Sequence, residues 1–482
     1  MGRDNYHNHM DIESFKKYGY KVIDELAYYY SHLEDYPVAP NISFGDILKK
    51  IPDHPPITGE SFDKIIDDVK NIITPGLLHW QSPNFFAFFP SNTSFPSILG
   101  ELYSAGFGVQ GMLWATSPAC TELEMKVMDW VAELLALPAK FTFEGSGGGV
   151  IEDSASTAAL CAIIAARESK TNYSANLNGV RMPLTAYLTS QTHSSVVKGL
   201  KIAGIGESNI RFVKTGKNYA MDVEDLEEQI NSDVTNGFVP FFVCATIGTT
   251  STNAVDPVSL IGALTEKHHM WLHVDAAMVG TAAICDEYKY LLDGLDRANS
   301  FCFNPHKWMF TNFDCDCFFV DDRRKLIAAL TILPEYLKNV THKNEKEIID
   351  YRDWQISLGR RFRALKLWFV IRHYGKEGLA FHIKKHIELA SIFEELVASS
   401  KDFELFAKRL VNLVCFRHKK GNLFNEKLLS EINKTGKIYL SHSKIDDVFF
   451  LRLCVGQTYT EKEHILKAWQ IIQDCANKIK PL

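Results

Sequence analysis

Two stretches of sequence decide the fold, WLHVDAA at residues 271–277 and SFCFNPHKW at residues 300–308. Each opens with a short apolar run, as in a buried strand, and the run is soon followed by an ionisable residue, Asp275 or Lys307. A further strand-like run at 238–246 precedes them, with a helix-like segment in between. This alternation predicts a mostly parallel sheet covered by helices.

Asp275 and Lys307 are the first candidates for chemistry. Burying an ammonium is costly unless its pKa falls, and an amine with a lowered pKa is suited to Schiff-base chemistry. Asp275 is expected at the carboxyl end of its strand, where open α/β sheets bind ligands, and there a protonated pyridine nitrogen would suit it. Taken singly, Asp275 could equally be a strand-end cap or a metal ligand, and Lys307 a structural lysine.

A glycine-rich stretch supplies a candidate anion site. GSGGG at 145–149 precedes Ser154-Ala-Ser156 and an apolar helix-like segment at 157–167. Backbone N–H groups at a helix N-terminus, together with small hydroxyl side chains, bind anions. A glycine run alone is more often just a loop, but beside Asp275 and Lys307 it becomes the third part of one constellation.

The composition excludes several classes of protein. The 482 residues are 46% hydrophobic with a formal net charge of -6, and no basic block is long enough to track a nucleic-acid backbone. No apolar run reaches the ~20 residues of a membrane helix, and the polar N-terminus is neither a secretory signal nor a transit peptide. Ten cysteines without a C-x-x-C pair suit buried thiols in a reducing compartment. We expect a cytoplasmic protein without a metal site, since the histidines show no ligand spacing.

We expect three segments: an N-terminal helical segment, a large α/β domain and a small C-terminal α+β domain, at residues 1–84, 85–375 and 376–482. In the first, helices are predicted at 12–36 and near 60–74, with too few interior residues to fold alone, so this segment is expected to pack on a partner subunit. In the last, two helices are predicted to flank two strands, at 376–400, 461–479, 410–417 and 448–455.

Motifs along essentially the whole chain resemble the aromatic L-amino acid decarboxylases, the group II pyridoxal-phosphate enzymes of plants and animals. They include HWQSP at 79–83, FFPSN at 88–92, GGGV at 147–150, QTHSS at 191–195, ATIGTT at 245–250, HVDAA at 273–277, NPHKW at 304–308 and GRRFR at 359–363. The resemblance implies the aspartate-aminotransferase-like (type I) fold, pyridoxal 5'-phosphate (PLP) as cofactor and a homodimer with a shared active site.

The resemblance also assigns roles to residues of this sequence. Lys307 would bind PLP covalently, Asp275 would hold the pyridinium and His193 would stack on the ring. Phosphate and neighbouring cofactor contacts would come from Ala155, Ser156, Asn304, Thr246 and Ala277. The substrate pocket would be lined by Trp80, Phe88, Pro90, Gln110, Met112, His306 and Gly359. Tyr336, in a polar loop at 333–346, would reach the partner's site and give the substrate's α-carbon its proton.

These residues favour amine formation over two alternatives. The related plant aldehyde synthases carry Phe at the loop tyrosine, or another residue such as Asn at the stacking histidine, whereas this chain keeps Tyr336 and His193. We therefore expect decarboxylation of an aromatic L-amino acid to the arylalkylamine and CO2. The alternatives are an aldehyde synthase, which yields aldehyde, ammonia and hydrogen peroxide, and a catalytically silent binding protein.

Several positions depart from the family pattern. Gln110, Met112 and Met278 replace residues that are usually apolar or aromatic, which indicates either an unusual substrate side chain or drift in a weakly selective enzyme. Gly359 goes with indolic substrates in plant relatives, so tryptophan or 5-hydroxytryptophan is favoured, with tyrosine, dopa and phenylalanine possible.

Two acids stand beside the expected phosphate loop. Glu152 and Asp153 replace a usual Gln-Gly pair, and they would repel a phosphate unless they point outward. Asp316, between Cys315 and Cys317, is a further charge without an evident partner.

Overall fold

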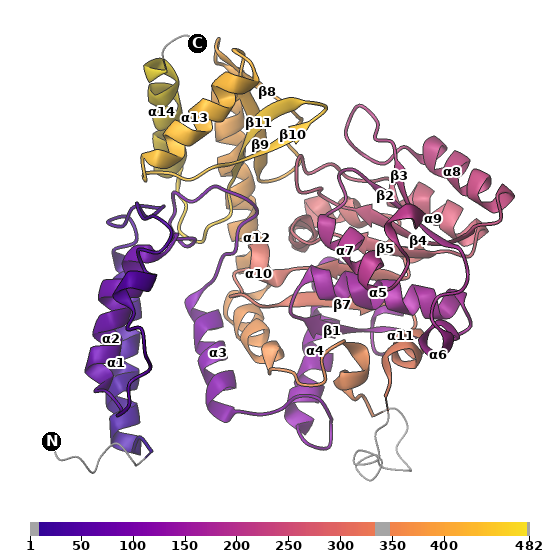
Figure 1. Ribbon diagram of the computed structural model, residues 1–482, viewed down its shortest axis with the longest axis horizontal. Helices are drawn as coiled ribbons and strands as arrows, with labels where there is room; N and C mark the ends of the chain where they lie inside the picture. Colours follow the sequence, from indigo (N-terminus) through magenta and orange to yellow (C-terminus); the bar gives the residue numbers. More distant parts are fainter. Residues whose placement is uncertain (1–8, 333–347, 480–482) are drawn as a thin grey trace.

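The computed structural model describes residues 9–332 and 348–479 and is built around a seven-stranded sheet (Figure 1). The strand order is β1-β7-β6-β5-β4-β2-β3. The strands are β1 Gly148–Glu152, β2 Leu184–Thr189, β3 Ile210–Val213, β4 Val239–Thr246, β5 Trp271–Asp275, β6 Ser300–Phe303 and β7 Asp316–Val320. Only β7 runs antiparallel to its neighbours, β1 and β6. The predicted mostly parallel sheet is confirmed.

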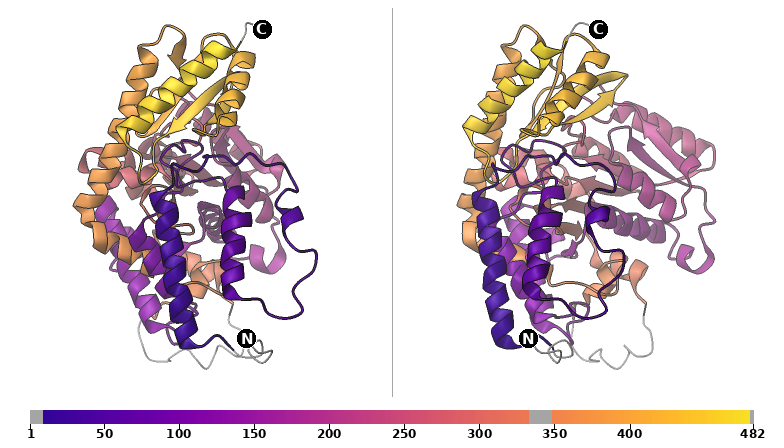
Figure 2. Two further views of the ribbon diagram at one scale, coloured as in Figure 1. Left: turned by 90° about the vertical axis from the view of Figure 1, so that its left-hand side faces the viewer. Right: turned by 60° about the vertical axis from the view of Figure 1, so that its left-hand side comes forward.

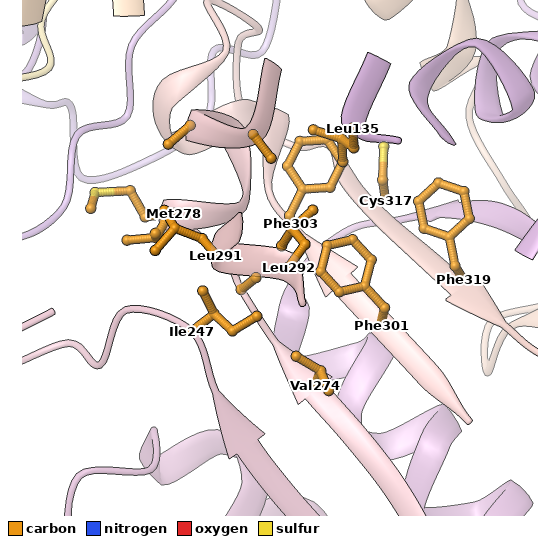
Figure 3. Packing of buried hydrophobic residues seen from close by; sticks show 14 of the residues in the cluster. Leu135, Ile247, Val274, Met278, Leu291, Leu292, Phe301, Phe303, Cys317 and Phe319 are labelled. Carbon is orange, nitrogen blue, oxygen red and sulfur yellow. The ribbon is translucent and has the colours of Figure 1, made fainter. Parts of the chain in front are cut away.

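Helices cover both faces of this sheet because successive strand residues point to opposite sides. On one face α5 (Ala155–Lys170), α7 (Ser194–Ile202) and α11 (Arg323–Leu330) pack on one buried core. On the other, α4 (Pro118–Leu135), α8 (Val223–Thr235) and α9 (Val258–Lys267) pack on a second core. Figure 3 shows part of this second core, where Val274, Phe301 and Phe319 lie together. The short helices α6 and α10 span Ala175–Asn178 and Pro305–Trp308.

A smaller sheet of order β10-β11-β9-β8 forms the C-terminal part of the protein. Its strands and helices are β8 Phe403–Leu405, β9 Leu413–His418, β10 Ser441–Ile445, β11 Val448–Cys454, α13 Asn422–Lys434 and α14 Lys462–Lys478. Helix α12, Arg363–Ala398, joins the two parts and is kinked at Gly375, whose φ is +61°. The helices and strands predicted here are confirmed, and the division into domains at residue 375 stays a prediction.

The N-terminal helices lie on the outside of the molecule (Figures 1 and 2). α1 spans Ile12–Ser31, shorter than predicted, and α2 spans Phe62–Asp68; a third helix, α3, spans Phe95–Phe107. Lys21 of α1 pairs with Asp63 of α2 at 2.7 Å. No residue of α1 is fully buried: Tyr18 packs on Phe62 and Tyr29 bonds to His79, whereas Phe15 and Val22 of its apolar stripe remain exposed.

A buried ion pair between Arg360, just before α12, and Glu124 of α4 connects both segments to β1. Arg360 donates to both carboxylate oxygens of Glu124, at 2.8 and 2.7 Å, and to the Ile151 carbonyl at 3.0 Å. The same carboxylate accepts from the Ile151 N–H at 2.8 Å. Both charged side chains are fully buried, so each depends on the other for compensation.

Arg360→Met therefore leaves the Glu124 carboxylate buried without its cation. We expect a loss of about 3–5 kcal/mol in the free energy of unfolding, seen as a lower Tm of the purified protein. The double variant Glu124→Leu/Arg360→Met should recover part of that loss, because no unpaired charge remains. A single variant as stable as the parent would contradict this account.

Candidate active site

Three of the predicted site residues, Thr246, Asp275 and Lys307, lie at the sheet edge where β4, β5 and β6 end. Thr246 lies opposite Asp275 in the β4–β5 register, and Asp275 lies opposite Cys302 in the β5–β6 register. Lys307 follows β6 by way of the short helix α10. The side chains of Thr246 and Asp275 belong to the sheet face covered by α5 and α7, because alternate residues of the same strands contribute to that core.

Backbone hydrogen bonds hold the two loops beyond β5 and β6 together. Asp275 Oδ1 accepts from the Ala277 N–H at 2.9 Å, and the Ala277 carbonyl accepts from the Asn304 N–H at 2.8 Å. Asp275 itself is only 6% exposed. The carboxylate is thus fixed in a largely apolar setting, where it favours a cationic partner.

Lys307 is partly buried at this edge. Burial lowers the pKa of its amine, and the charges of Asp275, Cys302 and Asp316 oppose that shift. The ammonium also lies 5.4 Å from the ring centroid of Phe89. An amine with a lowered pKa is more often unprotonated and nucleophilic, as attachment of a carbonyl cofactor requires.

His193 is the N-cap of α7, with its ring held by Ser195. The Ser195 N–H donates to Nδ1 at 3.3 Å, and the Ser195 hydroxyl lies 2.7 Å from the same atom. Burial lowers the pKa of the ring, with Asp275 opposing the shift and Lys307 adding to it. At neutral pH the ring is therefore uncharged, with its hydrogen on Nε2, and close enough to both charges to be influenced by them.

Asn304 presents a buried donor at the site. Burial lowers the pKa of His306 to about 3, so its ring is neutral. Its Nδ1 accepts from the Cys315 N–H at 2.8 Å, which places the ring hydrogen on Nε2, 3.0 Å from the Asn304 amide. The amide must therefore turn its oxygen to His306. As placed, the NH2 group faces His306 and Oδ1 is the atom without a partner among the described residues; turning the amide pairs Oδ1 with His306 and leaves the NH2 group as the free buried donor.

These groups fit PLP. The N–H groups of Ala155 and Ser156 open the 16-residue helix α5, whose N-cap Ser154 makes no side-chain cap bond, so the first turn can bind a phosphate. The Thr246 hydroxyl is likewise buried without a partner among the described residues. A phosphate acceptor would satisfy these donors, and a protonated ring nitrogen would satisfy Asp275. No group of three or more His, Cys, Asp or Glu side chains in the described ranges could hold a metal ion.

The residues predicted to line the substrate pocket differ in their burial and in the contacts that they make. Trp80 and Phe88 stack on each other with ring centroids 5.7 Å apart. Pro90 is buried against Gly456. His306 has both ring nitrogens occupied within the protein, so it has no free polar atom for a substrate.

Gln110 and Gly359 lie side by side: a Cβ at Gly359 would come within 3.0 Å of Gln110 Nε2. The main-chain N–H of Arg360 donates to Gln110 Oε1 at 2.6 Å. Met112 is partly buried, and its carbonyl accepts from Arg352. Met278 is fully buried in the core shown in Figure 3, so within this chain it presents no exposed surface to a substrate. Tyr336 and the predicted 333–346 loop lie outside the described residues.

Two residues of the site were missed in the sequence. Phe89 faces the Lys307 ammonium and lies 5.6 Å from the Arg452 guanidinium. Arg452, from β11, donates to the carbonyls of Thr250 and Ser251 beyond β4, at 2.6 and 3.2 Å. Phe89 could have been found as the neighbour of Phe88 in its motif, but no local signal marks Arg452.

Of the two acids beside the phosphate loop, Asp153 is exposed but Glu152 points inward. Glu152 is 3% exposed and lies opposite the fully buried Asp316 across β1 and β7. Burial raises the pKa of Glu152 to about 7, with Arg360 opposing the shift, and raises that of Asp316 well above its usual range. The two acids therefore differ: Asp153 is exposed to solvent, and the raised pKa of Glu152 reduces the negative charge that it carries near neutral pH.

Comparisons with known sequences and structures identify the family to which this chain belongs. Residues 45–419 match the pyridoxal-dependent decarboxylase conserved domain. The chain is 46% identical to a phenylacetaldehyde synthase of Arabidopsis thaliana, over 97% of each chain. It is 44% identical to tyrosine decarboxylase 2 of Narcissus pseudonarcissus, over 97% of this chain and 95% of the relative. The structure is similar to that of Oryza sativa TDC with PLP and tryptamine, at a TM-score of 0.94 and 38% identity, covering 98% and 99% of the two chains.

The Glu152 carboxyl gives the protein a testable pH dependence. Because its folded pKa of about 7 lies above the unfolded value of 4.5, the folded state binds more protons, and stability falls as pH rises between these values. Glu152→Gln removes this effect, so it should match the parent near pH 5 and exceed it above pH 8, by about 3 kcal/mol.

The measurement is the thermal unfolding of cofactor-free protein at both pH values. Asp153→Asn is the matched control: its exposed carboxylate only adds to the pKa shift that burial causes at Glu152, so this variant should reduce the pH dependence slightly and not remove it. An equal difference between Glu152→Gln and the parent at both pH values would contradict the assignment.

Proposed function

Because the chain belongs to the pyridoxal-dependent decarboxylase family, we propose that it removes the carboxylate of an aromatic L-amino acid as CO2 and releases the arylalkylamine. The observation that carries the proposal is the partly buried Lys307 amine near Asp275 at one sheet edge. PLP, when bound, supplies a ring that accepts the electron pair left behind as CO2 departs.

Each residue of the site has a role in this reaction. Lys307 would hold the cofactor through its amine. Asp275 would favour a protonated ring nitrogen, and the neutral His193 ring would contact the cofactor ring. The N–H groups of Ala155 and Ser156 and the Asn304 amide would hold the phosphate, with Thr246 and Ala277 as further contacts.

Tyr336 completes the reaction by giving a proton to the substrate's α-carbon. Its phenol is a general acid that keeps the electron pair from reacting with oxygen. In this proposal Tyr336 would act in the partner's site of a homodimer, and the exposed Phe15 and Val22 on α1 offer an apolar surface for such a partner. All ten cysteines are buried and unpaired, which supports a reducing compartment such as the cytoplasm. None of the described helices is long and apolar enough to span a membrane.

A second candidate reaction is oxidative, giving the aldehyde, ammonia and hydrogen peroxide. The 46% identity to a phenylacetaldehyde synthase favours it. The two reactions share the residues that hold the cofactor and differ in whether a proton or oxygen reaches the α-carbon first. We favour the amine because the chain retains both Tyr336 and His193.

The products distinguish the two reactions. Purified protein with PLP is incubated with tyrosine, dopa, phenylalanine, tryptophan, 5-hydroxytryptophan and histidine, and amines, aldehydes and peroxide are measured. We expect amine without stoichiometric peroxide. Tyr336→Phe, which removes the proton donor while keeping the ring, should shift the products of the same substrate to aldehyde and peroxide. Aldehyde and peroxide from the unaltered protein would contradict the proposal.

The proposed dimer predicts the effect of a charge on α1. Phe15→Asp places a carboxylate on the exposed part of the stripe and should shift the protein from twice its 54.6 kDa chain mass toward the monomer, as measured by light scattering. Leu177→Asp, at an exposed leucine outside the stripe, is the control and should stay dimeric. A parent protein that is monomeric at working concentration would contradict a shared active site.

A further inference from the structure

Two carboxyl groups lie opposite each other across β1 and β7. The antiparallel register pairs Glu152, the last residue of β1, with Asp316, the first residue of β7. Residues directly opposite in such a pair have Cβ atoms about 5 Å apart on one face of the sheet. Glu152 is 3% exposed and Asp316 is fully buried. Two buried carboxyls this close together are not both ionised near neutral pH, so the pair holds at least one proton.

The contacts of the pair leave its charge poorly compensated. Neither carboxyl oxygen of Asp316 has a hydrogen-bond partner among the described residues. Glu152 Oε1 lies 3.6 Å from the thiol of Cys161, on α5. Arg360 acts on Glu152 through its charge, but its guanidinium is bonded to the carboxylate of Glu124. A second negative charge on the pair would therefore be costly.

Burial has the largest effect on both carboxyls. It raises the pKa of Glu152 to about 7 and the pKa of Asp316 well above its usual range. The groups that oppose this rise are the two arginines near the start of α12, the α5 thiol and the lysine after β6, and those that add to it are neighbouring acids: Arg360, Arg363, Cys161 and Lys307 against Asp153, Asp275 and Cys315. The pair therefore carries two protons below about pH 7 and one above it.

Glu152 lies at the base of the expected phosphate site. It stands three residues before Ala155, whose N–H opens α5. Its carboxyl faces Cys161, which is about 9 Å along the same helix from Ala155, at ~1.5 Å per residue. A negative charge on Glu152 and a phosphate at the first turn of α5 would repel each other through a buried region, where screening by water is weak.

Asp316 lies on the Lys307 side of the same pair. It follows Cys315, whose N–H donates to His306 Nδ1 at 2.8 Å and whose carbonyl accepts from the His306 N–H at 3.3 Å. His306 directly precedes Lys307 in the sequence. The charges of Asp316 and Lys307 also act on each other's pKa. The carboxyl pair thus lies between the two ends of the cofactor site, the first turn of α5 and the Lys307 amine.

We propose that Glu152 and Asp316 form a carboxyl pair that takes up a proton from solvent when the phosphate of the cofactor binds and releases it when the phosphate leaves. A phosphate monoester carries close to two negative charges at neutral pH, and protonation of the pair removes the one charge that would repel them. Cofactor binding is thereby linked to pH and weakens above about pH 7. The proposal depends on the cofactor and not on which product the enzyme forms.

The test compares the parent with Glu152→Gln, an amide of the same shape that does not ionise. Cofactor-free protein is titrated with PLP by calorimetry in two buffers of different ionisation enthalpy, which gives the Kd and the number of protons taken up. Near pH 6 the two proteins should bind PLP equally, because the pair is uncharged in both. Near pH 8 Glu152→Gln should bind about tenfold more tightly and take up about one proton fewer, as linkage requires for a pKa of about 7.

Two controls separate the proton from other effects on binding. Asp153→Asn removes an exposed carboxylate from the same loop and should change the Kd by nearly the same factor at both pH values. Pyridoxal, which lacks the phosphate, then replaces PLP as the ligand. With pyridoxal the parent and Glu152→Gln should take up equal numbers of protons, because no phosphate approaches the pair.

Asp316→Val tests whether the two carboxyls act together. Without the shared proton the Glu152 charge loses a hydrogen-bond donor, so Glu152 stays protonated to a higher pH and the uptake near pH 8 should fall towards that of Glu152→Gln. Thermal unfolding of each cofactor-free variant shows that it is folded. If Asp316→Val does not fold, the comparison of Glu152→Gln with the parent still decides the proposal.

Equal proton uptake by the parent and Glu152→Gln at the higher pH would overturn the proposal. So would a ratio of their Kd values that is the same at both pH values, since a purely structural effect of the amide does not depend on pH. A difference in uptake that persists with pyridoxal would assign the proton to the ring or to Lys307, and parent-like uptake in Asp316→Val would assign it to Glu152 alone. Either result contradicts a carboxyl pair that responds to the phosphate.

Discussion

The parallel register of β4, β5 and β6 is the constraint on which the site depends. Because these strands run in the same direction, their carboxyl ends meet at one edge and bring Thr246, Asp275 and Lys307 together. Side chains alternate along a strand, so a slip of one residue would turn Asp275 into the apolar core where Val274 now packs. The strand register therefore determines which side chains reach the site, and the chemical properties of those side chains act only within that arrangement.

The sheet is packed on both faces, and this keeps the register unique. Val274 and Phe301 belong to one buried core, and Trp271 and Cys302 of the same two strands belong to the other. Hydrogen bonds continue beyond the strands, from Ala276 to the Cys302 carbonyl at 2.9 Å. This packing makes it possible to bury groups that oppose folding, the amine of Lys307 and the carboxyls of Glu152 and Asp316, at a single edge. Buried ionisable groups that oppose folding in this way are typical of functional sites.

The sequence predicts those features of the fold and the site that depend on residues close together along the chain. The apolar runs and the residues that follow them identify β5, β6, Asp275 and Lys307, because strand period and strand ends are local properties. Contacts between distant segments carry no local signal. Arg452 reaches Thr250 from another sheet, and Gln110 meets Gly359 across about half the chain. For this reason, neither the contact of Gln110 with Gly359 nor the burial of Met278 in the core was predicted from the sequence.

The measurement that tests the account most directly is the location of the covalent cofactor. The PLP-loaded protein is reduced with borohydride, digested and analysed by mass spectrometry. The account predicts a pyridoxyl group on Lys307 alone, and no covalent label in Lys307→Ala, because no other described lysine has its amine near Asp275 at the end of β6. A label on a different lysine, or an unlabelled Lys307 in the loaded parent protein, would contradict the assignment of this sheet edge as the active site.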